Sequence, residues 1–205
     1  MDLKATYNRI AEEWHRTHRT DSWWRPDTDA FISYLPKGAA VLDVGCGGGV
    51  KSKYLADAQL NVFGIDISDA MIVIARRQAP KAIFNVLDMR DVSRLERMFD
   101  GVFVQAALLH IPKREAIETL QKLVDVLKPG GYIYIAVKEQ KSEGPEEEVK
   151  REEEYGYSYE RFFSYFTADE VKRYLLSVGV EVAREDITVE PHVRWIQVIG
   201  KKIRK

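Results

Sequence analysis

The spacing of hydrophobic residues changes along this chain of 205 residues. Near its start, apolar side chains recur every three or four positions from Leu3 through Ile10 to Trp14, the spacing of one helix face. From Val41 onwards, short apolar runs alternate with stretches of helical period. Buried parallel strands are apolar on both faces and are joined by helices, so this alternation predicts an α/β fold with a covered parallel sheet.

Turn residues and caps set the expected bounds of these elements. Ser68 is an expected helix N-cap, and Pro80 is expected to stop the chain from continuing that helix. Thr167 and Glu170 have the spacing of a capping box. The expected strands lie near residues 41–44, 62–66, 83–87, 101–108, 132–137, 180–189 and 193–200. The expected helices lie near residues 27–35, 50–58 and 69–78, with two further apolar helix faces over residues 117–127 and 171–178.

Residues 41–49 read VLDVGCGGG, an apolar run followed by an acid and several glycines. A glycine-rich turn after a buried strand lets a ligand approach the backbone, and the next helix presents free N–H groups to it. The pattern indicates a site for a nucleotide-like cofactor. In a dinucleotide-binding turn the third glycine would stand at Val50, and Asp43 would repel the pyrophosphate. The acid favours a cationic ligand instead.

Asp43 with Gly45, Gly47 and Gly49 resembles the first motif of class I S-adenosylmethionine-dependent methyltransferases, an acid before Gly-x-Gly-x-Gly. Four further stretches resemble the same family in the same order, namely NVFGIDIS, FNVLDMRD, FDGVFVQAALLHI and LKPGG. Together the motifs cover roughly residues 38–138. The resemblance implies a doubly wound, Rossmann-like methyltransferase fold, with a mostly parallel seven-stranded sheet and an antiparallel last strand.

The resemblance also implies a site for S-adenosylmethionine and its product S-adenosylhomocysteine. Asp66, about 20 residues beyond the glycines, matches the position that holds the two ribose hydroxyls. Asp88 matches the acid that contacts the adenine amino group, with Met89 beside the ring, and Gln105 matches a cofactor contact at a strand end. The implied cofactor-binding residues are Tyr7, Asp43, Gly45, Cys46, Gly47, Gly49, Asp66, Ile67, Asp88, Met89 and Gln105.

Several of these residues also have a purely structural interpretation. Asp66 and Asp88 can be helix N-caps or turn residues, and Gly48 and Gly49 can simply relax a strand-to-helix turn. Tyr7 resembles an aromatic position that covers the methionine end of the cofactor, but a tyrosine on an apolar helix face can equally belong to the core. The sequence leaves these alternatives open.

Four other residues are candidates for chemistry at the site. His110 is the candidate catalytic residue, because it follows a strand end and histidine titrates near neutral pH. Its alternative role is to cap or pack the turn before Pro112. Arg16, Arg19 and Arg25 are candidate partners for the carboxylate of the cofactor, and the sequence does not choose among them.

Composition narrows the class of protein further. Cys46 is the only cysteine and no histidines stand at ligand spacing, so we expect neither an intramolecular disulfide nor a metal site. The formal net charge of −1 disfavours a nucleic-acid partner. No apolar run has the length of a membrane span, and the N-terminus lacks the apolar core of a signal peptide. We therefore expect a cytoplasmic protein without a membrane partner.

These patterns lead to one functional hypothesis and three alternatives. We expect a single methyltransferase domain over residues 1–205, with a helical lid at 1–36 and a substrate-side excursion at 139–166. The expected reaction is methyl transfer to an oxygen or nitrogen of a small-molecule acceptor. The alternatives are a transfer-RNA-modifying methyltransferase, a cofactor-binding module without catalysis, and an NAD-dependent oxidoreductase. The oligomeric state stays open.

The composition of the excursion leads to an expectation about the methyl acceptor. Residues 139–160 are acidic and weakly apolar, so we expect an exposed segment that repels phosphates and favours a small neutral or cationic acceptor. Tyr155, Tyr157 and Tyr159 alternate and would point to one side of an extended segment. They are expected either to form a wall over the reacting methyl group or to patch the edge of the sheet.

Overall fold

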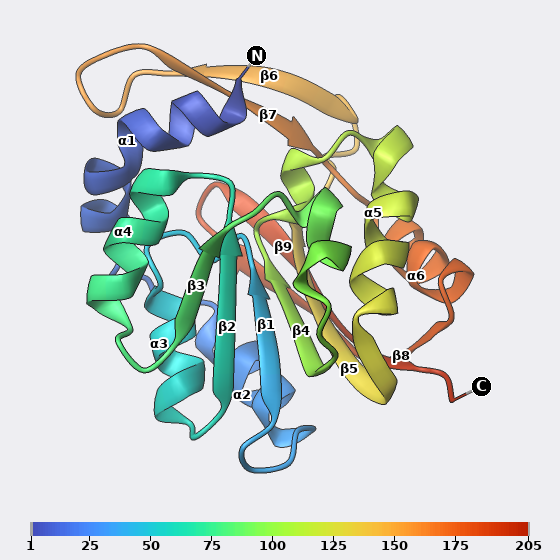
Figure 1. Ribbon diagram of the computed structural model, residues 1–205. Coiled ribbons are helices and arrows are strands. Elements are labelled where there is room, and N and C mark those ends of the chain that lie inside the picture. The colour runs from blue at the N-terminus through green and yellow to red at the C-terminus, as the bar shows by residue number, and fades with distance from the viewer. Residues whose placement is uncertain (1, 205) are drawn as a thin grey trace.

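The computed structural model describes residues 2–204. Its centre is a seven-stranded sheet in the order β3-β2-β1-β4-β5-β9-β8 (Figure 1). Strands β1 to β5 are parallel to one another, whereas β9 runs antiparallel to both β5 and β8. The expected fold class is therefore confirmed. The strands are β1 Ala40–Val44, β2 Asn61–Asp66, β3 Ile83–Val86, β4 Phe99–Gln105, β5 Leu127–Lys138, β8 Val180–Glu190 and β9 Val193–Lys202.

Helices cover both faces of this sheet. Successive strand residues point to opposite faces, so Val41 packs with Phe31 of α2 and Leu55 of α3, whereas Leu42 packs on the other face with Leu120 of α5. No helix within residues 2–204 is long and apolar enough to cross a membrane. The helices are α1 Leu3–His18, α2 Arg25–Ser33, α3 Val50–Asp57, α4 Asp69–Gln78, η1 Met89–Leu95, η2 Leu108–His110, α5 Lys113–Asp125 and α6 Ala168–Ser177.

Local capping signals set helix starts as expected. The hydroxyl of Ser68 accepts a hydrogen bond from the Met71 N–H at 3.1 Å, at the start of α4. At the start of α6, the Glu170 N–H donates to Thr167 Oγ1 at 3.2 Å, and the Thr167 N–H donates to Glu170 Oε2 at 2.9 Å. Each cap satisfies N–H groups that have no partner within the helix.

Three expected positions differ from the structure. The strand expected over residues 101–108 ends at Gln105, because Ala106 has a φ of 53° and turns the chain into η2. Leu127, expected on a helix face, instead begins β5 opposite Phe99. Ile117, expected on the same face, is 43% exposed.

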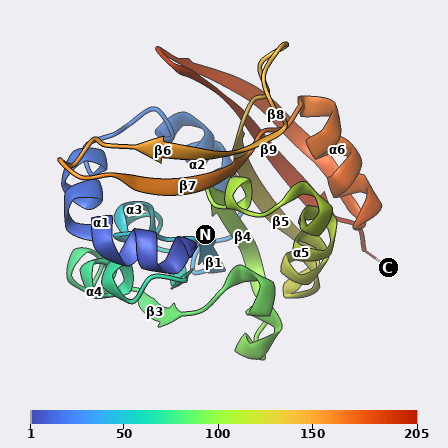
Figure 2. The ribbon, with the colours of Figure 1, turned by 90° about the horizontal axis from the view of Figure 1, so that it is seen from above.

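Residues 139–160, expected to be an exposed excursion, contain most of a second, two-stranded sheet. Strands β6 Glu147–Glu152 and β7 Tyr159–Ser164 form a hairpin that lies with α1 above the carboxyl ends of the main sheet (Figure 2). Within residues 139–160 the expectation is wrong for Tyr159, which is buried, and just beyond them Phe163 of β7 joins the main core. Contacts with the body of the protein, and not the acidic composition, decide where this segment lies.

Candidate functional site

A pocket of about 1030 Å³ opens at the carboxyl ends of the parallel strands, and residues of α1 and of the β6–β7 hairpin also line it. In the sheet order, β2 and β3 lie on one side of β1, whereas β4 and β5 lie on its other side. The order of the strands therefore reverses beside β1. Open α/β sheets bind ligands at such a switch point. The strand ends contribute Asp43 from β1, Asp66 from β2, Asp88 after β3, Gln105 from β4 and Lys138 from β5.

The glycine loop after β1 is held by backbone hydrogen bonds. The N–H groups of Gly45 and Cys46 both donate to the Ile65 carbonyl, at 2.8 and 3.0 Å. Gly45, Gly47 and Gly49 all have positive φ, a conformation that side chains other than glycine rarely adopt. The sequence therefore needs glycine here for the shape of the turn.

The motif glycines divide into two roles. Gly45, Cys46 and Gly47 line the pocket, as expected. Gly49 does not line it, since it stands at the N-cap of α3 with its Cα against Ala75 of α4. The thiol of Cys46 is buried, and burial raises its pKa well above the usual value, so it is not an activated nucleophile.

Asp43 and Asp66 are both pinned by hydrogen bonds at the base of the pocket. Asp43 Oδ2 accepts from the Ser52 hydroxyl at 2.5 Å, and burial raises the pKa of Asp43 to about 6. Asp66 Oδ2 accepts from the Gly47 N–H and Oδ1 from the Ser68 N–H, both at 2.9 Å. Burial also raises the pKa of Asp66. A carboxylate oxygen has two lone-pair directions, so Asp66 can still accept from two ligand hydroxyls.

Asp88 marks the adjoining wall with Met89 and Ile67. Arg90 Nη2 lies 2.6 Å from Asp88 Oδ2. Burial raises the pKa of Asp88, but the hydrogen bonds and the charge of Arg90 outweigh burial and hold the pKa below its usual range. Asp88 also caps η1 by accepting from the Arg90 N–H at 2.9 Å. The expected N-cap role and the expected pocket position therefore coincide in one residue.

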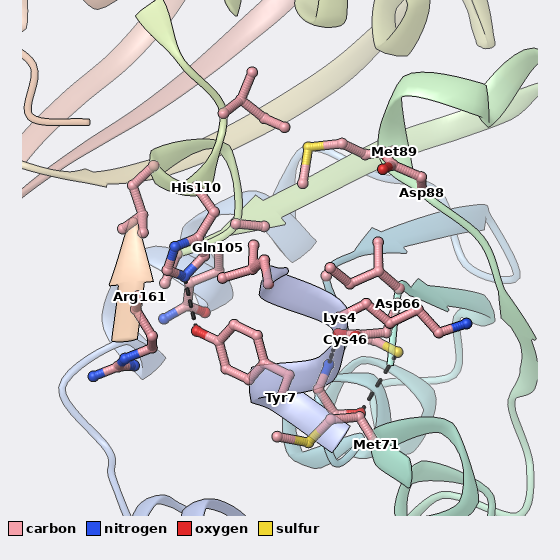
Figure 3. A pocket seen from close by; sticks show the side chains of 18 of the residues that line it. Lys4, Tyr7, Cys46, Asp66, Met71, Asp88, Met89, Gln105, His110 and Arg161 are labelled. Carbon is pink, nitrogen blue, oxygen red and sulfur yellow. Dashed lines mark hydrogen bonds between the residues drawn. The ribbon is translucent and has the colours of Figure 1, made fainter. Parts of the chain in front are cut away.

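Tyr7 and His110 form a hydrogen-bonded pair inside the pocket (Figure 3). His110 Nδ1 lies 2.7 Å from the Phe162 carbonyl, which can only accept, so Nδ1 carries the proton. The other ring nitrogen, Nε2, then accepts from the Tyr7 hydroxyl at 2.8 Å. Burial lowers the pKa of His110 to about 3, so the imidazole is neutral. This chain of bonds joins α1, η2 and β7.

Gln105 is an expected site residue whose buried side-chain amide has no hydrogen-bond partner among residues 2–204. It is 7% exposed, and neither Oε1 nor Nε2 has a hydrogen bond to any of residues 2–204. A buried amide without partners costs roughly 1–3 kcal/mol. Because Gln105 also lines the pocket, these atoms indicate a ligand that would form hydrogen bonds with them.

Two expectations from the sequence are not met. Arg16, Arg19 and Arg25 do not line the pocket. Tyr155, Tyr157 and Tyr159 do not line the pocket, and Tyr155 and Tyr157 contact α1 instead. Tyr157 donates to the Arg9 carbonyl at 3.3 Å, and its ring lies 4.0 Å from the Arg9 guanidinium carbon.

Sequence reasoning missed several pocket residues. They are Lys51, Lys138, Arg161 and Phe163, of which only Lys51, directly after the glycine loop, had a local signal. Arg161 pairs with Glu152 across the hairpin at 2.5 Å. Within residues 2–204, no group of three His, Cys, Asp or Glu side chains is arranged to hold a metal ion.

The fold and the site define an α/β domain for a nucleotide-like cofactor, and comparison with known proteins specifies the class. A family model described as "Methyltransferase domain" matches residues 41–131. A ubiquinone biosynthesis O-methyltransferase from Shewanella pealeana is 32% identical over 104 residues, 48% of this chain and 43% of that protein. A trans-aconitate 2-methyltransferase from Variovorax paradoxus is 32% identical over 111 residues, 53% of this chain and 42% of that protein. The chain thus matches less than half the length of these two relatives.

Solved structures extend the similarity to the whole fold. The crystal structure of Burkholderia thailandensis 1,6-didemethyltoxoflavin-N1-methyltransferase, with bound 1,6-didemethyltoxoflavin and S-adenosylhomocysteine, superposes with a TM-score of 0.77 at 18% identity. The match covers 98% of this chain and 87% of that one. Residues 41–131 thus match a methyltransferase-domain family, and the likeness to the solved methyltransferase structure concerns the fold of the chain.

Proposed function

We propose that the protein binds S-adenosylmethionine and transfers its methyl group to an oxygen or nitrogen atom of a small molecule. The observation that carries the proposal is the set of acids at successive strand ends around one pocket. Asp43, Asp66 and Asp88 stand beside the glycine loop in the order of the family motifs. The related O-methyltransferase and the N1-methyltransferase of similar fold support an oxygen or nitrogen acceptor.

The residues present fit this cofactor. Asp66 would hold the ribose hydroxyls, since two backbone N–H groups already orient its carboxylate. Asp88 would accept from the adenine amino group, with Met89 and Ile67 against the ring. Asp43, at the base of the pocket, would offset the positive charge of the ligand.

The methionine end would lie along the glycine loop. Gly45, Cys46 and Gly47 leave the backbone accessible there, and Gln105 and Tyr7 face the same space. When bound, the cofactor would supply an activated methyl group: the acceptor lone pair would form the new bond to the methyl carbon while the carbon–sulfur bond breaks and its electrons stay on the sulfur of S-adenosylhomocysteine. The protein mainly has to align the acceptor and exclude water.

Tyr7 and His110 act as positioning residues in this proposal. His110 is neutral and both its nitrogens are engaged, so it holds Tyr7 and β7 over the pocket. In this proposal α1 is a lid, because Leu3, Tyr7 and Trp14 of this helix line the pocket. Its buried residues Ile10 and Ala11 anchor it, with Ala11 in one cluster with Met71 of α4.

The cofactor assignment can be tested by calorimetric titration. We expect S-adenosylmethionine and S-adenosylhomocysteine to bind and NAD not to bind. Asp66→Ala should weaken binding of both by roughly 1–3 kcal/mol, since their ribose hydroxyls would lose a buried acceptor. Asp57→Ala, which changes an exposed acid at the end of α3, is the matched control and should bind as the unchanged protein does. Equal or tighter binding of NAD would contradict the assignment.

A further inference from the structure

Lys138 stands at the carboxyl end of β5 and lines the pocket without a polar partner. Its ammonium has no salt bridge within 4.0 Å and no hydrogen bond among residues 2–204. Two aromatic rings flank it instead, with Nζ 4.0 Å from the Phe163 ring centre and 5.9 Å from that of Trp195. This differs from Arg161, whose charge is already paired with Glu152.

The electrostatic surroundings favour an anion beside Lys138. Burial, together with the positive charges of Arg161 and Lys150, lowers the pKa of Lys138 to about 8. A cation held in that position without a counterion is unfavourable, and a bound anion would relieve the cost. The charges of Glu152 and Glu148 in the hairpin act in the opposite direction and offset this only in part, since neither forms a salt bridge with Lys138: Glu152 pairs with Arg161, and Glu148 accepts from the Tyr165 hydroxyl.

The unsatisfied amide of Gln105 lies on the same face of the sheet. Gln105 pairs with Ala136 in the β4–β5 register, and Ala136 is two residues before Lys138, so both side chains project to the same side. Gln105 and Lys138 therefore both present polar groups to the pocket, an amide and an ammonium, and neither group has a polar partner among residues 2–204.

A flat apolar surface adjoins these two polar groups. Trp195 is paired directly with Lys138 in the β5–β9 register, and its ring stacks on Trp23 with centroids 4.6 Å apart and planes at 17°. Both tryptophans line the pocket. Aromatic faces of this kind bind planar rings by offset or edge contacts.

We propose that this end of the pocket, defined by Lys138, Gln105, Trp23 and Trp195, is the acceptor subsite and selects a planar ring that carries an anionic oxygen. Lys138 binds the anionic oxygen, the Gln105 amide donates to it or to a neighbouring ring atom, and the tryptophans contact the ring. The anionic oxygen belongs either to a ring carboxylate or to an ionised ring hydroxyl. The proposal rests on the proposed methyl-transfer function, and it replaces the neutral or cationic acceptor that the acidic composition of the hairpin suggests.

The test uses the full chain saturated with S-adenosylhomocysteine and titrates small probes by calorimetry. The probes are 2-naphthoate, its uncharged amide 2-naphthamide, and 4-nitrophenolate at pH 8. We expect at least one anion to bind about 10-fold more tightly than the amide, because charge-assisted hydrogen bonds are the stronger ones. The anion that binds more tightly shows whether the subsite prefers a ring carboxylate or an ionised ring hydroxyl.

Two variants decide whether Lys138 makes the contact. Lys138→Met keeps an unbranched side chain of similar length but removes the charge. It should weaken anion binding by about 10- to 100-fold and leave the binding of 2-naphthamide unchanged. Lys150→Met removes a neighbouring positive charge that does not line the pocket, and should change anion binding less than 3-fold. Thermal melts establish that both variants are folded.

The outcomes separate this inference from the function on which it rests. If the unchanged protein does not bind S-adenosylhomocysteine, the proposed function fails. If it binds S-adenosylhomocysteine but prefers neither anion over the amide, or if Lys138→Met binds the anions as the unchanged protein does, the subsite assignment alone is overturned.

Discussion

Replacing Gly49 with alanine is expected to destabilise the protein by about 2–5 kcal/mol, the combined cost of a left-handed backbone and of steric overlap. Gly49 has a φ of 78°, and an added Cβ would lie 2.8 Å from Ala75 Cα, part of a helix backbone that cannot move aside alone. The free energy of unfolding, measured by urea denaturation, would report the loss.

The matched control for this substitution is Gly179→Ala, just beyond α6. Gly179 has a nearly identical φ of 76°, but an added Cβ there would have no neighbour within 4 Å. We expect only the backbone cost at this position, about 1–2 kcal/mol. Equal losses for the two variants would show that the close approach of α4 adds no steric cost at Gly49.

Replacing His110 with glutamine is expected to change how the stability of the protein depends on pH. Burial depresses the pKa of His110 from 6.5 to about 3. Between these values the unfolded chain binds a proton that the folded protein does not, so His110 lowers the free energy of unfolding as pH falls. Above pH 6.5 His110 no longer lowers the free energy of unfolding. Below pH 6.5 it lowers that free energy by at most about 1.4 kcal/mol for each unit by which the pH falls.

Comparison between variants isolates this slope. Asp43 acts in the opposite direction, because its raised pKa of about 6 makes the folded protein bind a proton more readily, and stability is lost as pH rises through that value. The Asp43 contribution is common to all variants. The difference in free energy of unfolding between the unchanged protein and His110→Gln should therefore shift in favour of the unchanged protein as pH rises from 4 to 6.5, whereas the difference for His192→Gln, in an exposed turn, should stay constant. Parallel curves for His110→Gln and the unchanged protein would mean that His110 is accessible to protons.

The strongest sequence signals were those with a local physical cause. The period of apolar residues predicted α4 over residues 69–78, and the Ser68 and Thr167 caps were correct, because a cap depends only on residues three or four positions away. The glycine loop and Asp66 also belong to this class. Their spacing is set by one strand, one turn and one helix, and the structure brings both into the pocket.

Contacts between distant segments could not be predicted in the same way. Tyr7 and His110 are 103 positions apart, and their hydrogen bond exists only because α1 and η2 meet above the sheet. The subsite around Lys138 likewise needs the register of β4, β5 and β9, which sets Gln105, Lys138 and Trp195 on one face. The acidic composition of the hairpin does not reveal these contacts, in which Glu152 pairs with Arg161 and Glu147 accepts from the Lys113 N–H.

The sequence by itself determined the class of fold, the glycine loop and the acids around it, because helix period, caps and turn conformation are properties of short segments. The tertiary structure alone decided what covers the pocket, which polar groups stay unpaired inside it, and which face the tyrosines of the hairpin cover. Those properties depend on which segments fold against one another, and the local sequence around a side chain does not determine which distant residue it contacts.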